Sequence, residues 1–189
     1  MPSNHIAAPY RYIVTASSER WSFAYLHKHI DWQEEELIMF GKAVKSPRLV
    51  AFYGEQGVCY SYSGQAYYGR GIPDWLRPLF AKAYEISGQT FNTVLCNLYR
   101  NGKDYMGWHS DDEPSLGPAP KIVMYSAGAT RDFCLRLKGE TSQRLIQSID
   151  DGSWLEMQAE MQVVWQHALP KRLRVTQPRV SLTFRQVIR

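Results

Sequence analysis

The second half of the chain is a succession of short β-strand segments, and this pattern limits the possible folds more than any other feature. After Gly88, apolar and β-branched residues gather in short runs at fairly even spacing, with no helical period between them. The predicted strands are 91–99, 122–127, 132–137, 144–149, 153–157, 162–166 and 179–185. A series of this kind is typical of a β-sandwich or jelly roll.

The first half of the chain mixes strand and helix patterns. A helix capped by Ser17 or Ser18 is expected to end near His29. A second helix is expected at 73–87, because a proline suits its first turn, one face is apolar and a glycine follows. The expected strands are 10–14, 36–40, 49–53 and 58–62. The sequence therefore predicts a mixed α/β (α+β) fold, with N-terminal helices before the β-rich half.

The length and composition fit one globular domain over residues 1–189. The chain is 44% apolar and 21% charged, which argues against disorder, and 189 residues are too few for two comfortable domains. Residues 1–90 are expected to form an N-terminal extension and 91–189 the jelly-roll core. The net charge of +4 is compatible with a polyanionic partner but does not require one.

The cysteines and the N-terminus predict an intracellular protein. Cys59, Cys96 and Cys134 are odd in number and far apart, which suits neither a disulfide framework nor a clustered zinc site. The first residues carry neither a basic leader nor a long apolar run, and no segment has the length of a membrane helix. We expect a cytoplasmic monomer with no membrane contact, associated with the nucleoid if the chain is bacterial.

A possible metal site is formed by His109, Asp111 and the distant His167. On an extended segment, residues two apart point to the same side, so His109 and Asp111 can share an ion. His167 follows an apolar run and would lie at a strand end. Two imidazoles and one carboxylate make the facial triad of non-haem iron(II) oxygenases. Alternatively the His-x-Asp pair arises by chance, because such pairs are common.

The last predicted strand supports the metal interpretation. Residues 179–185 alternate strictly between apolar side chains and a polar set of Arg179, Ser181, Thr183 and Arg185. Such a strand can be a surface strand with its arginines in water. If the polar face instead lines the barrel interior, the two arginines need an anion, and a dicarboxylic acid such as 2-oxoglutarate fits them. Asn97 and Tyr99 can add neutral hydrogen bonds.

At this point the chain resembles the AlkB family of nucleic-acid dealkylases over roughly residues 36–189. The iron and arginine motifs that match are Asn97-Leu98-Tyr99, His109-Ser110-Asp111-Asp112-Glu113, His167-Ala168-Leu169-Pro170 and the stretch from Pro178 to Arg185. Motifs typical of the branch with the animal double-strand-preferring homologues are Phe40-Gly41-Lys42, Pro47-Arg48, Tyr53-Gly54, the stretch from Tyr60 to Gly64 and the stretch from Gly88 to Asn92.

This resemblance implies oxidative removal of alkyl groups from DNA bases, with RNA as an open alternative, and a role for each matching residue. His109, Asp111 and His167 would hold Fe(II). The residues expected to bind 2-oxoglutarate, which reacts with O2, are Asn97, Tyr99, Arg179, Ser181, Thr183 and Arg185. The residues expected to contact nucleic acid are Phe40, Gly41, Lys42, Arg48, Tyr60, Tyr62, Asp112, Lys171, Arg172 and Arg174. The family also implies a double-stranded β-helix (jelly roll) with a β-rich nucleotide-recognition lid.

Several substrate-side features admit two interpretations. Met39-Phe40 matches a family loop that wedges into a duplex, but Phe40 can equally be a core residue at a strand end. Leu173 interrupts a basic triplet that the double-strand branch keeps continuous, and Tyr62 stands where a phenylalanine is usual. Trp108 is expected either to pack or to contact a base.

Three alternative functions remain open on the sequence. The same site suits a hydroxylase of a protein, lipid or small molecule, or an RNA demethylase. A nucleic-acid-binding module without catalysis is the third alternative. The preferred lesion, the strandedness of the substrate and the oligomeric state are not encoded in any motif.

Overall fold

The chain is described by a computed structural model that covers residues 8–39, 42–62, 64–142 and 145–188. In the hairpin between the second and third strands, the side chains of residues 37–43 lie outside this description. None of the helices in the described ranges has the length and apolar character needed to cross a bilayer.

A seven-stranded antiparallel sheet forms the larger layer of the fold. Its strand order is β1-β11-β8-β13-β6-β3-β2. The bounds are β1 Tyr10–Val14, β2 Gln33–Met39, β3 Lys42–Gly54, β6 Thr93–Tyr99, β8 Ile122–Gly128, β11 Ser153–Met157 and β13 Arg179–Arg185. The N-terminal strands therefore extend both edges of a sheet whose centre comes from the second half of the chain.

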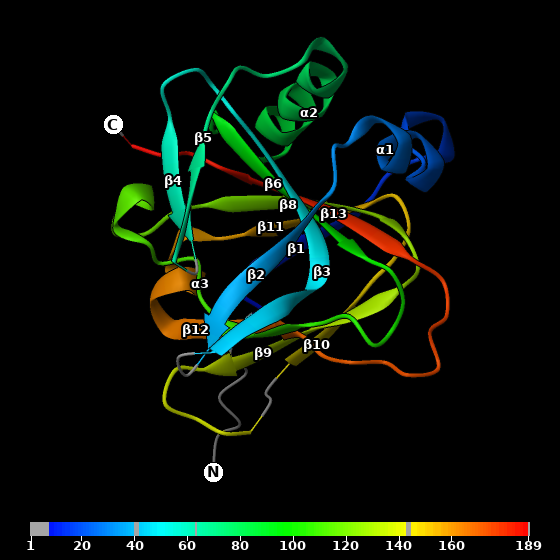
Figure 1. Cartoon of the computed structure of the whole chain (residues 1–189), viewed down its shortest axis with the longest axis vertical. Helices are drawn as coiled ribbons and strands as arrows, with labels where there is room; N and C mark the ends of the chain where they lie inside the picture. The colour runs from blue at the N-terminus through cyan, green and yellow to red at the C-terminus, as the bar shows by residue number, and fades with distance from the viewer. Residues whose placement is uncertain (1–7, 40–41, 63, 143–144, 189) are drawn as a thin grey trace.

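A four-stranded sheet packs against this layer, and a small hairpin lies at one side (Figure 1). The four-stranded order is β10-β9-β12-β7, with bounds β7 Met106–His109, β9 Arg131–Leu137, β10 Leu145–Ile149 and β12 Trp165–Leu169. The hairpin consists of β4 Cys59–Tyr62 and β5 Gln65–Tyr68. The predicted jelly-roll fold class is confirmed.

Two helices cover the outer face of the large sheet. In Figure 1, α1 (Phe23–His29) and α2 (Arg77–Ser87) lie on the side of this sheet opposite the four-stranded sheet. Three single-turn 3-10 helices occupy connections, at Ser17–Glu19, Asp74–Leu76 and Pro114–Leu116. A third helix, α3 (Ala159–Val164), directly precedes β12.

Both faces of β13 are buried, for different reasons. Its residues Val180, Leu182 and Phe184 point outward and join the apolar side chains of α2 in one core cluster. The alternate residues point inward between the sheets, where the pocket described below lies. The alternation predicted for residues 179–185 is therefore real, and the solvent-facing alternative is wrong because all seven residues are buried.

Several predicted element bounds need correction. The first helix begins at Phe23, because Ser22 is its N-cap and accepts a hydrogen bond from the Tyr25 backbone N–H at 3.2 Å. The strand predicted at 162–166 is wrong in its first part, since Ala159–Val164 is helical and the strand starts at Trp165. The strands at Gln65–Tyr68 and Met106–His109 were not predicted.

The third strand is longer than predicted. β3 begins at Lys42 and continues through Pro47, whereas the predicted strand began at residue 49. The register with β2 shifts between Glu34 and Glu36, so the β3 residues around Pro47 form an irregularity in the ladder. A proline is tolerated at such a bulge because no ladder N–H is required there.

Candidate active site

Two neighbouring strands of the smaller sheet bring the predicted metal ligands together. β7 ends at His109, and His167 on antiparallel β12 lies directly opposite it in the register. The two imidazole ring centroids are 4.2 Å apart. Asp111 follows β7, and its Oδ1 lies 3.9 Å from Nε2 of His109. One candidate ligand atom from each of the three residues lies within 4.8 Å of the others.

A backbone carbonyl fixes the tautomer of His109. Its Nδ1 lies 2.8 Å from the carbonyl oxygen of Gly107. Because a carbonyl oxygen only accepts hydrogen bonds, Nδ1 carries the proton of the neutral ring, and the lone pair is on Nε2. The nitrogen that faces Asp111 is therefore free to bind a metal ion.

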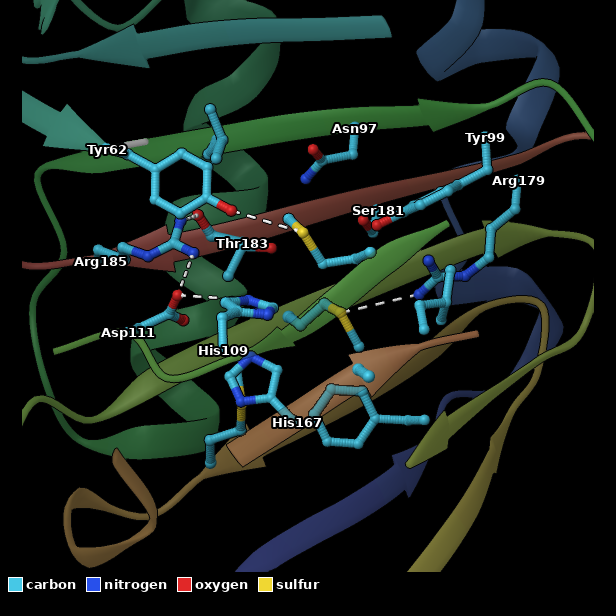
Figure 2. Close-up of a pocket in the computed structure, with 17 residues that line it drawn as sticks. Tyr62, Asn97, Tyr99, His109, Asp111, His167, Arg179, Ser181, Thr183 and Arg185 are labelled. Carbon is cyan, nitrogen blue, oxygen red and sulfur yellow. Dashed lines mark hydrogen bonds and ion pairs between the residues drawn. The ribbon is translucent and has the colours of Figure 1, made fainter. Parts of the chain in front are cut away.

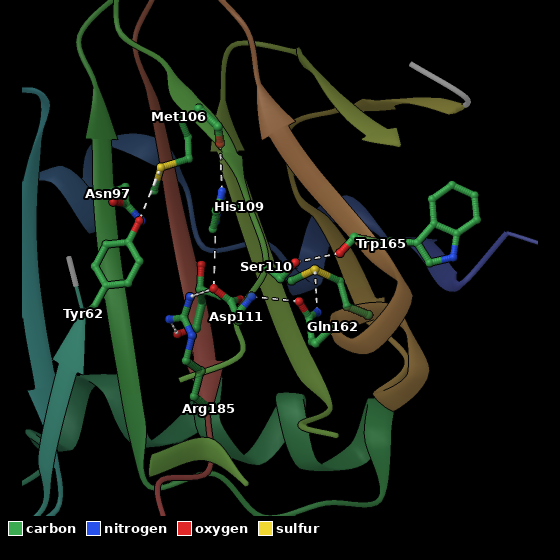
Figure 3. Close-up of polar contacts among 12 residues, drawn as sticks. Tyr62, Asn97, Met106, His109, Ser110, Asp111, Gln162, Trp165 and Arg185 are labelled. Carbon is green, nitrogen blue, oxygen red and sulfur yellow. Dashed lines mark hydrogen bonds and ion pairs between the residues drawn. The ribbon is translucent and has the colours of Figure 1, made fainter. Parts of the chain in front are cut away.

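The turn between the first two ligands is tied to α3 and β12 (Figure 3). The backbone N–H of Asp111 donates to Oε1 of Gln162 at 2.9 Å. The hydroxyl of Ser110 donates to the carbonyl oxygen of Trp165 at 2.8 Å. These bonds hold the carboxylate-bearing turn against the strand that carries the second histidine.

The local electrostatics favour the protonation states that ligate metals. Burial lowers the pKa of the His109 imidazole, and burial together with His109 lowers the pKa of His167 to about 3. Burial alone would raise the pKa of Asp111, but Arg185 and both imidazoles bring it down to about 2. Neutral imidazoles and an ionised carboxylate are the forms that bind a metal ion.

Two buried atoms of this trio lack a hydrogen-bond partner within the described part of the chain. They are Oδ2 of Asp111 and Nδ1 of His167. Buried polar atoms are nearly always paired, so unpaired ones need a reason. A metal ion held by the trio would be a partner for Oδ2 of Asp111, and the donor set of two nitrogens and a carboxylate suits Fe(II).

The predicted cosubstrate residues line the same pocket as the metal trio. Figure 2 shows Arg185 beside the trio and Arg179 at the far end, with Thr183 and Ser181 between them along β13. Asn97 and Tyr99 lie on the neighbouring strand β6, directly opposite Ser181 and Arg179 in the register. The structure thus brings all nine predicted metal and cosubstrate residues into one cavity.

The guanidinium of Arg179 is a buried cation at the far end of this pocket. Its Nε donates to the Ser126 hydroxyl at 2.9 Å, and its centre lies 5.4 Å over the Tyr99 ring. Burial lowers its pKa to about 10, which still leaves it charged at neutral pH. No carboxylate pairs with it among the described residues. A buried cation of this kind is stabilised by an anion, and the distal carboxylate of 2-oxoglutarate fits.

The predicted nucleic-acid contacts are found in different environments. Tyr62 lines the pocket, and its hydroxyl lies 3.5 Å from the sulfur of Met106. Tyr60 is buried and stacks on Tyr62, with ring centroids 6.3 Å apart. Arg48 is also buried, and its Nε donates to Oδ1 of Asn97 at 2.7 Å. Phe40 and Gly41 lie outside the described residues, as does the side chain of Lys42.

The remaining predicted contacts lie on the surface. Asp112 forms an exposed ion pair with Lys138 at 2.9 Å. The ammonium of Lys171 lies 4.8 Å over the Tyr105 ring, and Arg172 pairs with Asp132. Arg174 is exposed. Lys171, Arg172 and Arg174 border a shallow groove beyond the end of β12 and not the metal pocket.

Several residues that shape the site were not predicted. Phe133 stacks on the His167 ring at 5.1 Å, and Gln162 holds the Asp111 backbone. Both residues lie in segments that were predicted only as strands. Trp108 does not line the pocket; its ring lies 4.5 Å from the guanidinium carbon of Arg136.

Comparison with known proteins places the chain in a family. Residues 8–185 match the model of the 2OG-Fe(II) oxygenase superfamily, and the chain therefore belongs to that superfamily. The solved structure of OsALKBH1 superposes with a TM-score of 0.57 over 81% of this chain and 80% of the other, at 16% identity. That likeness concerns the fold.

Curated relatives confirm the predicted resemblance to the AlkB family. Human alpha-ketoglutarate-dependent dioxygenase alkB homolog 3 is 40% identical over 178 residues, which are 88% of this chain and 61% of the relative. Mouse DNA oxidative demethylase ALKBH2 is 38% identical over 157 residues, 79% and 66% of the two chains. The Arabidopsis thaliana protein of the same name is 34% identical over 197 residues, 90% and 63%. The chain thus spans about three fifths of the length of its first relatives.

The family match and the trio together confirm the predicted Fe(II), 2-oxoglutarate and O2. When bound, Fe(II) and 2-oxoglutarate supply an oxidation by O2 that yields succinate and carbon dioxide. The chain's own residues supply the rest. The trio would hold the metal ion from one side, and the two arginines would pair with the carboxylates of 2-oxoglutarate.

Proposed function

We propose that the chain oxidatively dealkylates N-alkylated bases in nucleic acid, with DNA as the expected substrate, and releases the alkyl group of a methylated base as formaldehyde. The observation that carries this proposal is the aromatic wall of the pocket. Tyr62 lines the cavity that contains the metal trio, and Tyr60 backs it with its ring plane only 12° from parallel. A flipped base would stack on such a surface, with its alkyl carbon near the metal.

The names of the relatives support the same proposal. ALKBH2 of mouse and of Arabidopsis thaliana are called DNA oxidative demethylases. The exposed cations Lys171 and Arg174 lie in a groove beyond β12, where they would contact phosphates without reading sequence. We further propose that Phe40 enters the gap left by a flipped base in a duplex.

Mass spectrometry of methylated oligonucleotides tests the proposal. Single-stranded and duplex DNA and RNA that carry one methylated base are incubated with the protein, Fe(II), 2-oxoglutarate and ascorbate, beside a panel of metabolites and peptides. We expect the methyl group to be lost from an oligonucleotide. Oxidation of a metabolite or peptide with every oligonucleotide left intact would contradict the proposal and favour another substrate class of the same superfamily.

A further inference from the structure

We infer that Arg48 is a positioning residue for the cosubstrate: it sets the direction in which the Asn97 side-chain amide faces, so that the amide NH2 group is presented to 2-oxoglutarate. This inference depends on 2-oxoglutarate binding at Asn97 and not on the identity of the alkylated substrate.

Arg48 lies behind Asn97 as seen from the pocket. Asn97 lines the pocket, and Arg48 does not. Both side chains are buried, with 4% exposure each, and Nε of Arg48 donates to Oδ1 of Asn97 at 2.7 Å. Arg48 therefore reaches the pocket only through the amide that lies between them.

The hydrogen bond from Arg48 fixes which end of the Asn97 amide faces the pocket. A guanidinium has only donors, so the amide atom that faces it must be the oxygen. The NH2 group of Asn97 then faces away from Arg48, and it is the part of the amide that can donate to an anion. Without Arg48, the amide can rotate by 180° and present its oxygen, which would repel a carboxylate.

The pairing of β3 with β6 places Arg48 beside Asn97. Val50 of β3 lies opposite Asn97 of β6, and Arg48 precedes Val50 by two residues on the same strand. It also follows directly on the irregularity around Pro47, where the register of β2 and β3 shifts. Bulges commonly re-aim side chains next to active sites, and here Arg48 points inward despite its charge.

The charge of Arg48 is not balanced by a carboxylate of the described residues. Within the described residues, no carboxylate forms an ion pair with it, and Asn97 is its one side-chain hydrogen-bond partner. The nearby carboxylate of Glu35 accepts from the Tyr67 hydroxyl at 2.8 and 2.9 Å. A buried arginine without a carboxylate partner is costly unless an anion or hydrogen-bond acceptors meet it, and a dicarboxylate in the pocket would be such an anion. Its field adds to those of Arg179 and Arg185 and favours a dianion.

Calorimetric titration of 2-oxoglutarate into the Mn(II)-loaded protein tests the inference without turnover. We expect Arg48→Met to raise the Kd by about tenfold, the effect of losing a charge-supported hydrogen bond, and Asn97→Ala to raise it similarly. In the double variant, Arg48→Met should add less than about twofold to Asn97→Ala, because Arg48 acts through that amide. An unchanged Kd in Arg48→Met, or fully additive effects, would overturn the inference.

Arg136→Met is the matched control. Arg136 also donates from Nε to a side-chain amide, Oε1 of Gln166 at 3.0 Å, but neither residue lines the pocket. Its Kd for 2-oxoglutarate should equal that of the wild type. If Arg48→Met does not fold, Arg48→Gln replaces it, because a glutamine amide both donates and accepts and therefore does not fix which way the Asn97 amide faces. A folded Arg48→Gln protein with wild-type affinity would equally overturn the inference.

Discussion

Arg185 donates a hydrogen bond from Nη2 to Oδ1 of Asp111 at 3.1 Å, although 74 residues separate the two in the chain. Both side chains are buried, with 5% and 1% exposure. Asp111 raises the pKa of Arg185 against the opposing effect of burial, so the guanidinium stays charged. One arginine thus contacts a predicted metal ligand and lines the pocket predicted for the cosubstrate, so we expect binding of the metal and of 2-oxoglutarate to be coupled.

Lysine should not be able to replace either of the two pocket arginines, Arg179 and Arg185. Arg179→Lys and Arg185→Lys keep the charge but lose the planar fork that binds a carboxylate through two bonds. The KM for 2-oxoglutarate should rise at least about tenfold in each variant, as measured by succinate production. Arg185→Lys should in addition weaken Mn(II) binding, and Arg179→Lys should not. Wild-type KM values in both variants would contradict the assignment of β13 to the cosubstrate.

The metal-free protein should become less stable as the pH falls below the pKa of histidine in an unfolded chain, which is about 6.5. Burial lowers the folded pKa of His109 below the value of about 6.5 expected in the unfolded chain and lowers that of His167 to about 3, so the unfolded state binds more protons as the pH falls below about 6.5. Stability is therefore fully present above about pH 6.5 and is lost progressively below it, by up to about 1.4 kcal/mol per pH unit for each histidine.

Urea denaturation of the metal-free protein between about pH 7.5 and about pH 5 measures this dependence. The His167→Asn variant should lose part of the slope because one of the two buried imidazoles is gone. The depressed pKa of Asp111 adds a further loss only at lower pH, below about 4. A urea midpoint that stays constant or rises on acidification would show that the imidazoles are not buried in their neutral form.

The buried Arg131 should contribute more to the free energy of unfolding than the exposed ion pair between Arg77 and Asp74. Its Nη2 donates to the carbonyl oxygens of Asp104 at 2.9 Å and Pro170 at 2.8 Å, and it is almost fully buried. Arg131→Met leaves those acceptors unpaired and should lower the free energy of unfolding by on the order of 3 kcal/mol. Arg77→Met removes an exposed pair with Asp74 and should change it by less than about 0.5 kcal/mol. Equal effects in denaturant titrations would contradict this account.

Most strands of the second half and the polar face of β13 were predictable because local patterns encode them. The alternation over 179–185 identified both the core face and the pocket face, and the strand bounds match those of the structure. The pairing of His167 with His109 was not predictable, because register between distant strands depends on tertiary packing. The position of Gln162 was missed for a related reason: a six-residue helix is set by its neighbours, and two adjacent valines suggested a strand.

The basic segment after β12 should contribute unequally to nucleic-acid binding. Arg172 is already neutralised by Asp132, whereas Arg174 is exposed. Arg174→Gln should reduce the slope of log affinity against log salt by about one unit, and Arg172→Gln by less. Fluorescence anisotropy with an unmodified oligonucleotide at several salt concentrations measures both. Identical slopes in the two variants and the wild type would exclude this groove from the binding surface.

The central claim is that His109, Asp111 and His167 hold the iron that oxidises an alkylated base. The most direct measurement is the ratio of formaldehyde to succinate formed with Fe(II), 2-oxoglutarate and a methylated oligonucleotide, in the wild type and in the variants His109→Ala, Asp111→Ala and His167→Ala. The account predicts equal amounts of both products, matched by the demethylated oligonucleotide, in the wild type. It predicts neither product in folded variants. Demethylation that persists in any of the three variants at limiting iron, or succinate without formaldehyde in the wild type, would contradict it.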